Sequence, residues 1–431
     1  MAKEPAPPEI VDQPSAEDMS RCVHCGFCLQ ECPTYLQLGL ETDSPRGRIH
    51  LIQALTEGRV EATSSLVGHL DLCLQCRACE TACPSGVPFG RIMETGRAML
   101  VQRGTVPLSW KVRVWLLQQL LPYPKRLRML FSLLRWYQRA GIQRLVRSRF
   151  AQRITPRRLT EAESMLPEVP ATAFRLSAHA ETGTRRVALL TGCVMPILYP
   201  RTHEATVRVL ARNDIAVVAP EEQCCCGALN LHAGDRRTAR ELARRNIDAF
   251  LSARVEAVIV NSAGCGSAMK EYGELLAADP AYAEKARRFS GMVQDVTEFL
   301  AALPFRPPNG PIEQRVTLQD SCHLAHAQQI RAAPREILRA IPGLELVEME
   351  APDRCCGSAG IYSFAQREMS LSLLDDKMRD VAATGAPVIA TANPGCMLQL
   401  EAGLRRHGLE GRVVHVVELL DEAYRAEEEA R

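Results

Sequence analysis

The sequence lacks several features that would point at once to an activity. No Gly-x-Gly-x-x-Gly segment opens a helix after a strand, so nothing resembles a nicotinamide or flavin site. The N-terminal stretch MAKEPAPPEIVDQPSAEDMS has acidic residues and prolines where a secretory signal has a basic start and an apolar run. We therefore expect a cytoplasmic protein with no catalytic residues of its own and no organic cofactor.

Cysteine, by contrast, is abundant. The chain of 431 residues is long enough for about two to four domains, and its 46% hydrophobic residues allow packed cores. It also has 17 cysteines, an odd number. In a reducing compartment, clustered thiols are more often metal ligands or redox groups than structural disulfides. The cysteine groups are therefore the first places to look for function.

Eight cysteines fall into two runs with the same spacing. The first run, CVHCGFCLQECP, begins at Cys22, and the second run, CLQCRACETACP, begins at Cys73. Both follow the bacterial ferredoxin pattern C-x2-C-x2-C-x3-C-P, in which three thiolates hold one cluster and the fourth crosses to the other. Zinc knuckles are the simpler alternative, but four tetrahedral thiolates explain neither the third cysteine step nor the proline. We therefore predict two [4Fe–4S] clusters, with the ligands Cys22, Cys25, Cys28 and Cys83 for the first and Cys73, Cys76, Cys79 and Cys32 for the second.

The other nine cysteines form an internal repeat. In each half, a β-branched run ends in Cys, a second run leads to Cys-Cys-Gly (CCG), and a third ends in Gly-Cys, at nearly equal spacings. The ninth cysteine, Cys224, has Arg354 at the matching place, so we interpret it as a spare thiol. The recurring cysteines are candidate ligands for one metal site per half: Cys193, Cys225, Cys226 and Cys265, then Cys322, Cys355, Cys356 and Cys396.

Strands and helices alternate through both halves, which predicts parallel sheets covered on both faces. Right-handed crossovers bring strand ends of like direction to one edge, where open α/β sheets bind their ligands. Glycine after each cysteine pair would let the backbone approach an inorganic group. The predicted fold is therefore multidomain α+β: a mainly helical two-cluster ferredoxin-type domain, a helical connector and two tandem α/β CCG repeats, over 1–100, 101–184, 185–305 and 314–431.

The two ferredoxin runs, the segment SPRGRIHLIQALTEG at 44–58 and the two CCG repeats together resemble the iron-sulfur subunit of bacterial glycolate oxidase. From pattern alone, Ser44 is a helix N-cap, Pro45 is the first helical residue, and Arg46 and Arg48 are solvated charges. CCG repeats alone are less specific, because heterodisulfide reductase, lactate-utilisation and anaerobic glycerol-3-phosphate dehydrogenase subunits share them. The resemblance implies FAD-containing partner subunits that oxidise glycolate to glyoxylate, and an electron-transfer role toward a membrane quinone or another acceptor.

The CCG repeats depart from the fullest form of this family. Heterodisulfide reductase subunits that bind noncubane clusters end each repeat in C-x-x-C, whereas Ala268 and Gln399 stand at the final positions here. Each site could therefore hold a four-thiolate iron–sulfur cluster, a zinc ion or a redox dithiol. Cys224 could add a ligand in the first repeat, and His323 or His326 in the second. We expect one or two further clusters, or zinc.

Residues 101–160 are strongly basic. They contain 14 Lys or Arg, no Asp or Glu, and the three tryptophans of the chain, Trp110, Trp115 and Trp136. No apolar run in this segment approaches the ~18 residues that span a bilayer. This composition is typical of helices on an anionic membrane surface, which would make the protein peripheral on the inner face of the cytoplasmic membrane. A basic hairpin docked on an acidic partner subunit is the alternative, and the absence of a reading motif disfavours nucleic acid.

Three functions remain open from the sequence. The first is an electron-transfer iron–sulfur subunit of a glycolate dehydrogenase, with the flavin chemistry on partner subunits. The second is a subunit of the heterodisulfide reductase, lactate or glycerol-3-phosphate dehydrogenase type, and the missing C-x-x-C endings weigh against thiol chemistry at the CCG sites. The third is a zinc-thiolate scaffold, which the ferredoxin runs disfavour.

Overall fold

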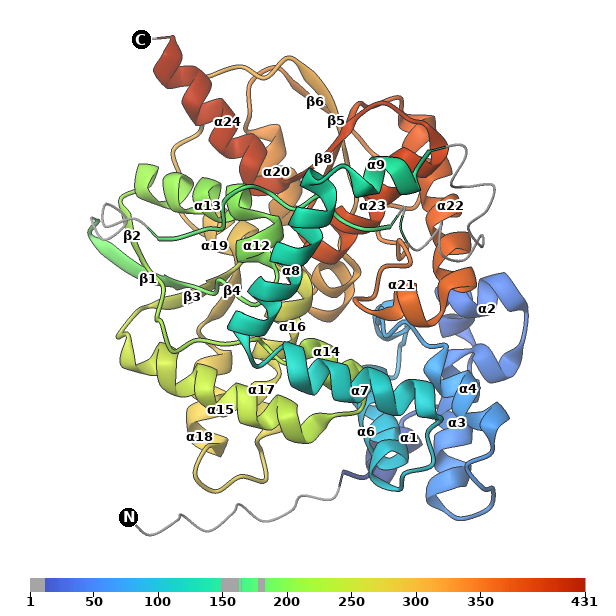
Figure 1. Ribbon diagram of the computed structural model, residues 1–431. Coiled ribbons are helices and arrows are strands. Elements are labelled where there is room, and N and C mark those ends of the chain that lie inside the picture. The colour runs from blue at the N-terminus through green and yellow to red at the C-terminus, as the bar shows by residue number, and fades with distance from the viewer. Residues whose placement is uncertain (1–11, 149–162, 164, 177–182, 431) are drawn as a thin grey trace.

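The computed structural model describes residues 12–148, 163, 165–176 and 183–430 (Figure 1). Residues 1–11 and 149–162 fall in the predicted ferredoxin-type domain and connector and lie outside the described ranges. Within those ranges, no helix combines the length and the apolar composition needed to cross a membrane. The division of the chain at 100, 184 and 314 stays a prediction.

The N-terminal part, which contains both ferredoxin runs, is helical. Ser44 caps the central helix by accepting a hydrogen bond from the Gly47 amide at 3.0 Å, and Pro45 follows at the first helical position, as predicted. Gly96, on the helix Phe89–Gln102, lets that helix approach the central helix Pro45–Thr56, because a Cβ at position 96 would lie 2.9 Å from Ile52 Cδ1. The elements are α1 (Ala16–Ser20), η1 (Phe27–Leu29), α2 (Pro33–Leu38), η2 (Glu41–Asp43), α3 (Pro45–Thr56), α4 (Ser64–Asp71), α5 (Ala78–Thr81) and α6 (Phe89–Gln102).

The basic connector forms helices α7 (Leu108–Leu120), α8 (Pro124–Arg139) and α9 (Ile142–Val146), which run across the front of the molecule in Figure 1. The composition of the connector predicted that Trp110 lies at a membrane interface, and for this tryptophan the prediction was wrong. Its side chain is only 1% exposed, and its indole N–H donates to the Ala233 carbonyl at 2.9 Å. Trp110 therefore anchors α7 on the first CCG repeat.

Two four-stranded parallel sheets of the same topology form the rest of the molecule, which confirms the predicted repeats. Their strand orders are β2-β1-β3-β4 and β6-β5-β7-β8. Strands β2, β3 and β7 are buried along their whole length, as expected where helices cover both faces, whereas the edge strand β6 stays partly exposed. The strands are β1 (Arg185–Leu189), β2 (Ile215–Val218), β3 (Ala257–Val260), β4 (Val293–Asp295), β5 (Gln314–Leu318), β6 (Leu344–Val347), β7 (Val388–Thr391) and β8 (Arg412–His415).

Corresponding helices connect the strands of the two repeats. In the first repeat these are α12 (Met195–Leu198), α13 (Pro200–Arg212), α14 (Ala228–His232), α15 (Arg236–Ser252), α16 (Ala263–Lys270), α17 (Tyr272–Leu275), α18 (Ala283–Ser290) and α19 (Val296–Ala301). In the second they are the π-helical turn η4 (His323–Ala327), α20 (Ala332–Arg339), α21 (Tyr362–Ala365), α22 (Arg367–Thr384), α23 (Pro394–His407) and α24 (Val416–Glu429).

The two repeats pack against each other. Helices α13 and α24 lie side by side, and an Arg208–Asp421 ion pair of 2.7 Å joins them. A single apolar core contains residues from both sheets, including Val187 of β1 and Val316 of β5, each fully buried. The loops that carry the cysteines of both repeats are therefore held at fixed positions relative to each other.

Candidate metal centres

Both ferredoxin runs adopt the same unusual backbone. His24 and Gly26 in the first run have φ angles of 58° and 87°, and Gln75 and Arg77, at the matching places in the second run, have 55° and 65°. Side chains rarely tolerate this left-handed region, so its recurrence at four matched positions reflects a common loop shape. The shared spacing therefore produces a shared local structure.

The first predicted ligand set surrounds one cavity. Cys22, Cys25, Cys28 and Cys83 all line it, as does Cys79 of the second set, and its empty volume is about 420 Å³, including space open to solvent. The Val87 amide donates to Cys83 Sγ at 3.5 Å, which orients the thiol that we predict to cross from the second run. Burial raises the pKa of the Cys28 thiol to about 11, so that a thiolate without a bound metal is unfavourable at this position. Four thiols around a cavity suit an iron–sulfur cluster.

This cavity lies at the protein surface. Cys25 is exposed, while Cys22, Cys28 and Cys83 are half-buried. Val23 and Phe27, which flank Cys25 in the first run, are each 66% exposed. An exposed apolar pair beside an exposed ligand position gives this site a surface on which a partner could dock.

The second predicted ligand set lies in the interior. Cys32, Cys73, Cys76 and Cys79 are all buried. Burial raises the pKa of Cys76 and of Cys79 well above the usual value, and the charges of Cys32 and Cys73 add to this effect in both cases. The structure thus brings the four thiols into one electrostatic neighbourhood, as the crossing pattern predicts.

Arg48 is part of this interior site, and its interpretation as a solvated charge was wrong. It is 1% exposed, its Nη1 lies 3.9 Å from Cys32 Sγ, and its Nη2 forms a 3.3 Å ion pair with Asp43. Arg46, two positions earlier, stays near the surface and pairs with Glu41. Helical periodicity explains the difference, because residues two apart point to different sides of α3.

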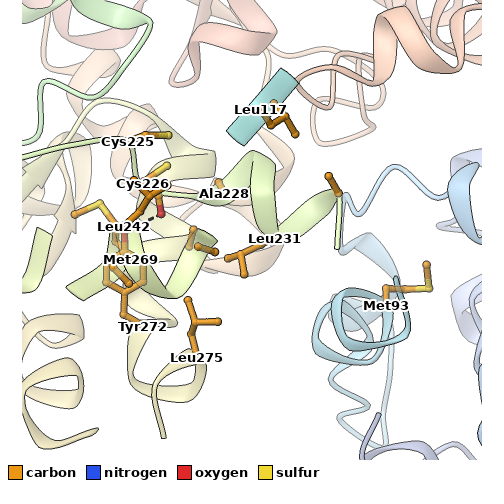
Figure 2. Close-up of a cluster of buried hydrophobic side chains, with 14 of the residues drawn as sticks. Met93, Leu117, Cys225, Cys226, Ala228, Leu231, Leu242, Met269, Tyr272 and Leu275 are labelled. Carbon is orange, nitrogen blue, oxygen red and sulfur yellow. Dashed lines mark hydrogen bonds between the residues drawn. The ribbon is translucent and has the colours of Figure 1, made fainter. Parts of the chain in front are cut away.

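The first CCG site forms at the carboxyl edge of its sheet, as predicted. The thiols of Cys193, Cys225, Cys226 and Cys265 lie close enough to shift one another's pKa, each acting on the next in that order. The neighbouring thiols of Cys193 and Cys226 stabilise the thiolate form of Cys225, which holds its pKa well below the usual value. Figure 2 shows Cys225 and Cys226 before α14, with Tyr272 beneath them, whose hydroxyl donates to the Cys226 carbonyl at 2.7 Å.

Cys224 points away from these thiols. Its Sγ donates to the Leu242 carbonyl of α15 at 3.5 Å, and burial raises its pKa to about 12. The glycine after each pair has a left-handed φ, 81° at Gly227 and 82° at Gly357, and each also lies close to a helix. A Cβ at Gly357 would lie 2.4 Å from the Ser370 carbonyl oxygen, and Gly227 faces Ala239 Cα at 3.2 Å. Both glycines permit close packing of the loop on a helix.

The second CCG site has the same arrangement. The thiols of Cys322, Cys355, Cys356 and Cys396 lie close enough to shift one another's pKa, each acting on the next in that order. His326 is engaged elsewhere, because its two ring nitrogens contact Thr81 Oγ1 at 3.0 Å and the Asp353 carbonyl at 3.2 Å. His323 lies against the ring of His232, with 5.2 Å between ring centroids.

Sequence reasoning missed Asn393, which joins the two CCG sites. Its Nδ2 donates to Cys396 Sγ at 3.5 Å, and its Oδ1 accepts from the Gly264 amide at 3.3 Å and from the Ser262 hydroxyl at 3.2 Å. The signal was present in the repeat, since Asn393 and Ser262 stand at equal distances before Cys396 and Cys265. Matched residues of the two repeats therefore meet each other.

The second ferredoxin run also contacts the second CCG site. Cys76 packs in one apolar cluster with Cys355 and Tyr362, and Cys322 lies at its edge. The Tyr362 hydroxyl donates to the Leu72 carbonyl at 2.9 Å, directly before Cys73. These contacts place two predicted metal sites next to each other.

The donor sets fit polynuclear clusters. Among the residues that the structure describes, which include all 17 cysteines, no three Cys, His, Asp or Glu side chains are arranged to hold a single metal ion. Each set nevertheless gathers four thiols, the ligands that iron–sulfur clusters take. Which cysteine holds which cluster stays a prediction.

Three known families match separate parts of the chain. The family described as "4Fe-4S dicluster domain" matches residues 18–87, which confirms the predicted two-cluster domain. The family described as "Cysteine-rich domain" matches 187–270 and 316–401, the two CCG repeats. The family described as "Glycolate oxidase iron-sulfur subunit, linker region" matches 111–166. The basic connector is thus a recognised part of this architecture.

Whole-chain relatives extend the match. The chain is 42% identical over 426 residues to a "Probable glycolate oxidase iron-sulfur subunit" of Bacillus subtilis, covering 96% of each protein. It is 35% identical to the "Glycolate oxidase iron-sulfur subunit" of Escherichia coli, covering 94% of each. A crystal structure of a hypothetical protein from Helicobacter pylori has a TM-score of 0.58 at 9% identity, covering 95% of this chain and 72% of that one, and shows likeness of fold alone. The chain belongs to the glycolate oxidase iron-sulfur subunit family.

Proposed function

We propose that this protein is the electron-transfer subunit of a glycolate-oxidising complex. A FAD-containing partner subunit oxidises glycolate to glyoxylate and takes up two electrons, and this chain carries them one at a time toward a membrane quinone or another acceptor. The family membership and the two-cluster domain support the role, and the first ferredoxin run supports the place at which electrons enter.

The observation that carries this proposal is the order of the thiol groups from surface to interior. Cys25 of the first run is exposed, Cys76 of the second run is buried, and Cys76 packs beside Cys355 of the second CCG repeat. When bound, [4Fe–4S] clusters supply one-electron transfer at the sites of the two runs. Cys22, Cys25, Cys28 and Cys83 hold one, and Cys32, Cys73, Cys76 and Cys79 hold the other.

The CCG repeats supply at least one further iron–sulfur site in this proposal. Four neighbouring thiols that shift one another's pKa recur in each repeat, and the second set adjoins Cys76. The ligands are Cys193, Cys225, Cys226 and Cys265 in the first repeat and Cys322, Cys355, Cys356 and Cys396 in the second. Cys224, which bonds to the backbone of α15, is outside the set.

In this proposal the connector supplies the protein surface that binds the membrane. Helices α7 and α8 contain no acidic residue, and their exposed side chains include Trp115 at 56%, Trp136 at 64% and Met129 at 64%. Exposed lysines and arginines accompany them: Lys111, Lys125, Arg126, Arg128 and Arg139. Tryptophan and basic residues together fit the interface of an anionic bilayer on the inner face of the cytoplasmic membrane.

Liposome co-sedimentation tests the membrane surface. The assembled complex should bind phosphatidylglycerol vesicles at low salt and release as salt rises, because exposed charges are screened within about 10 Å at 0.1 M. Replacing Trp115 and Trp136 with serine should weaken binding while Trp110, which is buried, is kept. Absence of binding, together with retention of these helices in the partner interface, would identify an acidic subunit as their contact.

Affinity purification from the native host tests the function itself. Anaerobically purified protein should bring down flavoprotein subunits, and the complex should reduce an artificial one-electron acceptor with glycolate in preference to lactate and glycerol 3-phosphate. Reduction with lactate or glycerol 3-phosphate alone would assign the protein to a different dehydrogenase. Zinc without iron after anaerobic reconstitution would contradict the electron-transfer role altogether.

A further inference from the structure

Arg97, on α6, is a buried cation without a carboxylate partner. Its side chain lies in the interior at 5% exposure, and among the described residues no ion pair joins it to an acidic group. All its hydrogen bonds go to backbone carbonyls: Leu70 at 2.7 Å, Asp71 at 3.3 Å and Cys73 at 2.6 Å from Nη2, Leu70 at 3.1 Å from Nε, and His232 at 2.7 Å from Nη1.

Carbonyls at the C-terminus of α4 offset part of the Arg97 charge, but no carboxylate near it is free to balance the rest. Trp110 faces it, with 5.8 Å from the guanidinium carbon to the ring centroid. The side chain of Asp71 is engaged by Arg113, which itself lies 4.8 Å from the same ring. Asp71 and Arg113 therefore compensate each other, and the charge of Arg97 remains.

The other arginines near the cysteine runs differ from Arg97. Arg48, at the Cys32 side of the second site, has Asp43 as its ion-pair partner. Arg46, beside the first run, pairs with Glu41 near the surface. Of these three, Arg97 alone is both buried and unpaired.

A buried charge is strongly unfavourable unless an opposite charge lies close to it. A [4Fe–4S] cluster with four thiolate ligands carries net negative charge, and Cys73, whose carbonyl bonds to Arg97, is a ligand of the second cluster in the proposed function. We propose that Arg97 is the counter-charge of the cluster held by Cys32, Cys73, Cys76 and Cys79, and that it raises the reduction potential of that cluster.

This inference rests on the proposed ligand assignment and adds a reason why the buried site can accept electrons. Burial alone makes a negative cluster harder to reduce, because the added electron increases a charge that the interior solvates poorly. When an electron moves inward, the first site is oxidised by one electron and the second is reduced by one. Arg97 stabilises the more negative, reduced state of the second site.

Mediated redox titration of the full-length protein, reconstituted anaerobically and followed by EPR, tests the inference. The second-run signal is the one that Cys76→Ser removes. In Arg97→Gln, the reduction equilibrium of that signal should become about tenfold less favourable, which is about 59 mV lower for one electron, with the first-run signal unchanged. Arg97→Lys should titrate close to the wild type. Arg103→Gln, which removes the same charge from an exposed position after α6, should change neither signal.

The outcomes separate charge from structure. Loss of the second cluster in Arg97→Gln but not in Arg97→Lys would also support the counter-charge. An unchanged potential in iron-replete Arg97→Gln, or equal loss of the cluster in the glutamine and lysine variants, would overturn it. Because mediators replace the flavoprotein, the result does not depend on the partner. If Cys76→Ser removes no signal, the ligand assignment fails instead.

Discussion

Cys25 of the first ferredoxin run lies at the surface between Val23 and Phe27, whereas Cys76, at the same place in the second run, is buried beside Cys355 and Tyr362. The two runs share their spacing and their left-handed backbone positions. What differs is the surroundings, which come from parts of the chain far away in sequence. The spacing therefore sets a shared loop shape, and the rest of the fold sets which run is exposed and which is buried.

Matched cysteine substitutions in the two runs should show the largest difference between the exposed and the buried site. Cys25→Ser and Cys76→Ser should each remove about four irons per chain, the content of one [4Fe–4S] cluster. Only Cys76→Ser should also lower the unfolding temperature by about 10 °C or more, because loss of a buried metal site removes folding free energy as well as packing. Iron analysis and thermal unfolding under argon would measure both. Equal losses of stability would show that the two environments do not matter.

Cys32→Ser separates the effect of sequence position from that of burial, because Cys32 belongs to the first run by sequence but is buried in the interior. We expect it to disturb the second-run EPR signal and leave the first-run signal in place, as the crossing of the fourth ligand requires. Cys83→Ser is the matched control and should do the reverse. A Cys32→Ser protein that loses the first-run signal would refute the crossing.

Substitution of Trp110 tests how much the packing of α7 on the first CCG repeat contributes to the stability of the fold. Trp110→Ala should cost about 3–5 kcal/mol of unfolding free energy, because it leaves a cavity and an unpaired Ala233 carbonyl. Trp115→Ala, five positions along α7 and 56% exposed, should change stability by less than about 0.5 kcal/mol. Denaturant unfolding of both variants would decide, and comparable losses would mean that Trp115 is also packed in solution.

Phe27 tests the surface of the first run, with a smaller expected effect. Phe27→Ala should raise the concentration of this subunit needed for half-maximal glycolate-dependent acceptor reduction by about tenfold, since central aromatic residues at interfaces contribute about 1–2 kcal/mol. Phe364→Ala, with 63% exposure on α21, is the matched control and should have no effect. If both variants behave like the wild type, the partner docks elsewhere.

Spacing and repetition in the sequence predicted much of this molecule. The two ferredoxin runs, the parallel sheets of both CCG repeats and the cap at Ser44 all follow from local pattern, and the structure agrees. The burial of Arg48 and of Trp110 did not follow, because composition cannot tell which side of a helix meets a distant segment. Arg97 shows the limit most clearly, since its bond to the His232 carbonyl spans 135 positions of sequence.

The order in which glycolate reduces the two sites tests whether electrons enter at the exposed first run and then pass to the buried second run. In the complex with its flavoprotein partner, glycolate should reduce the first-run signal of Cys76→Ser in freeze-quench EPR, although no electrons reach the acceptor. In Cys25→Ser, neither the second-run signal nor the acceptor should be reduced. Reduction of the second-run signal at the wild-type rate in Cys25→Ser would contradict the account, because electrons would then enter the protein without passing through the exposed site.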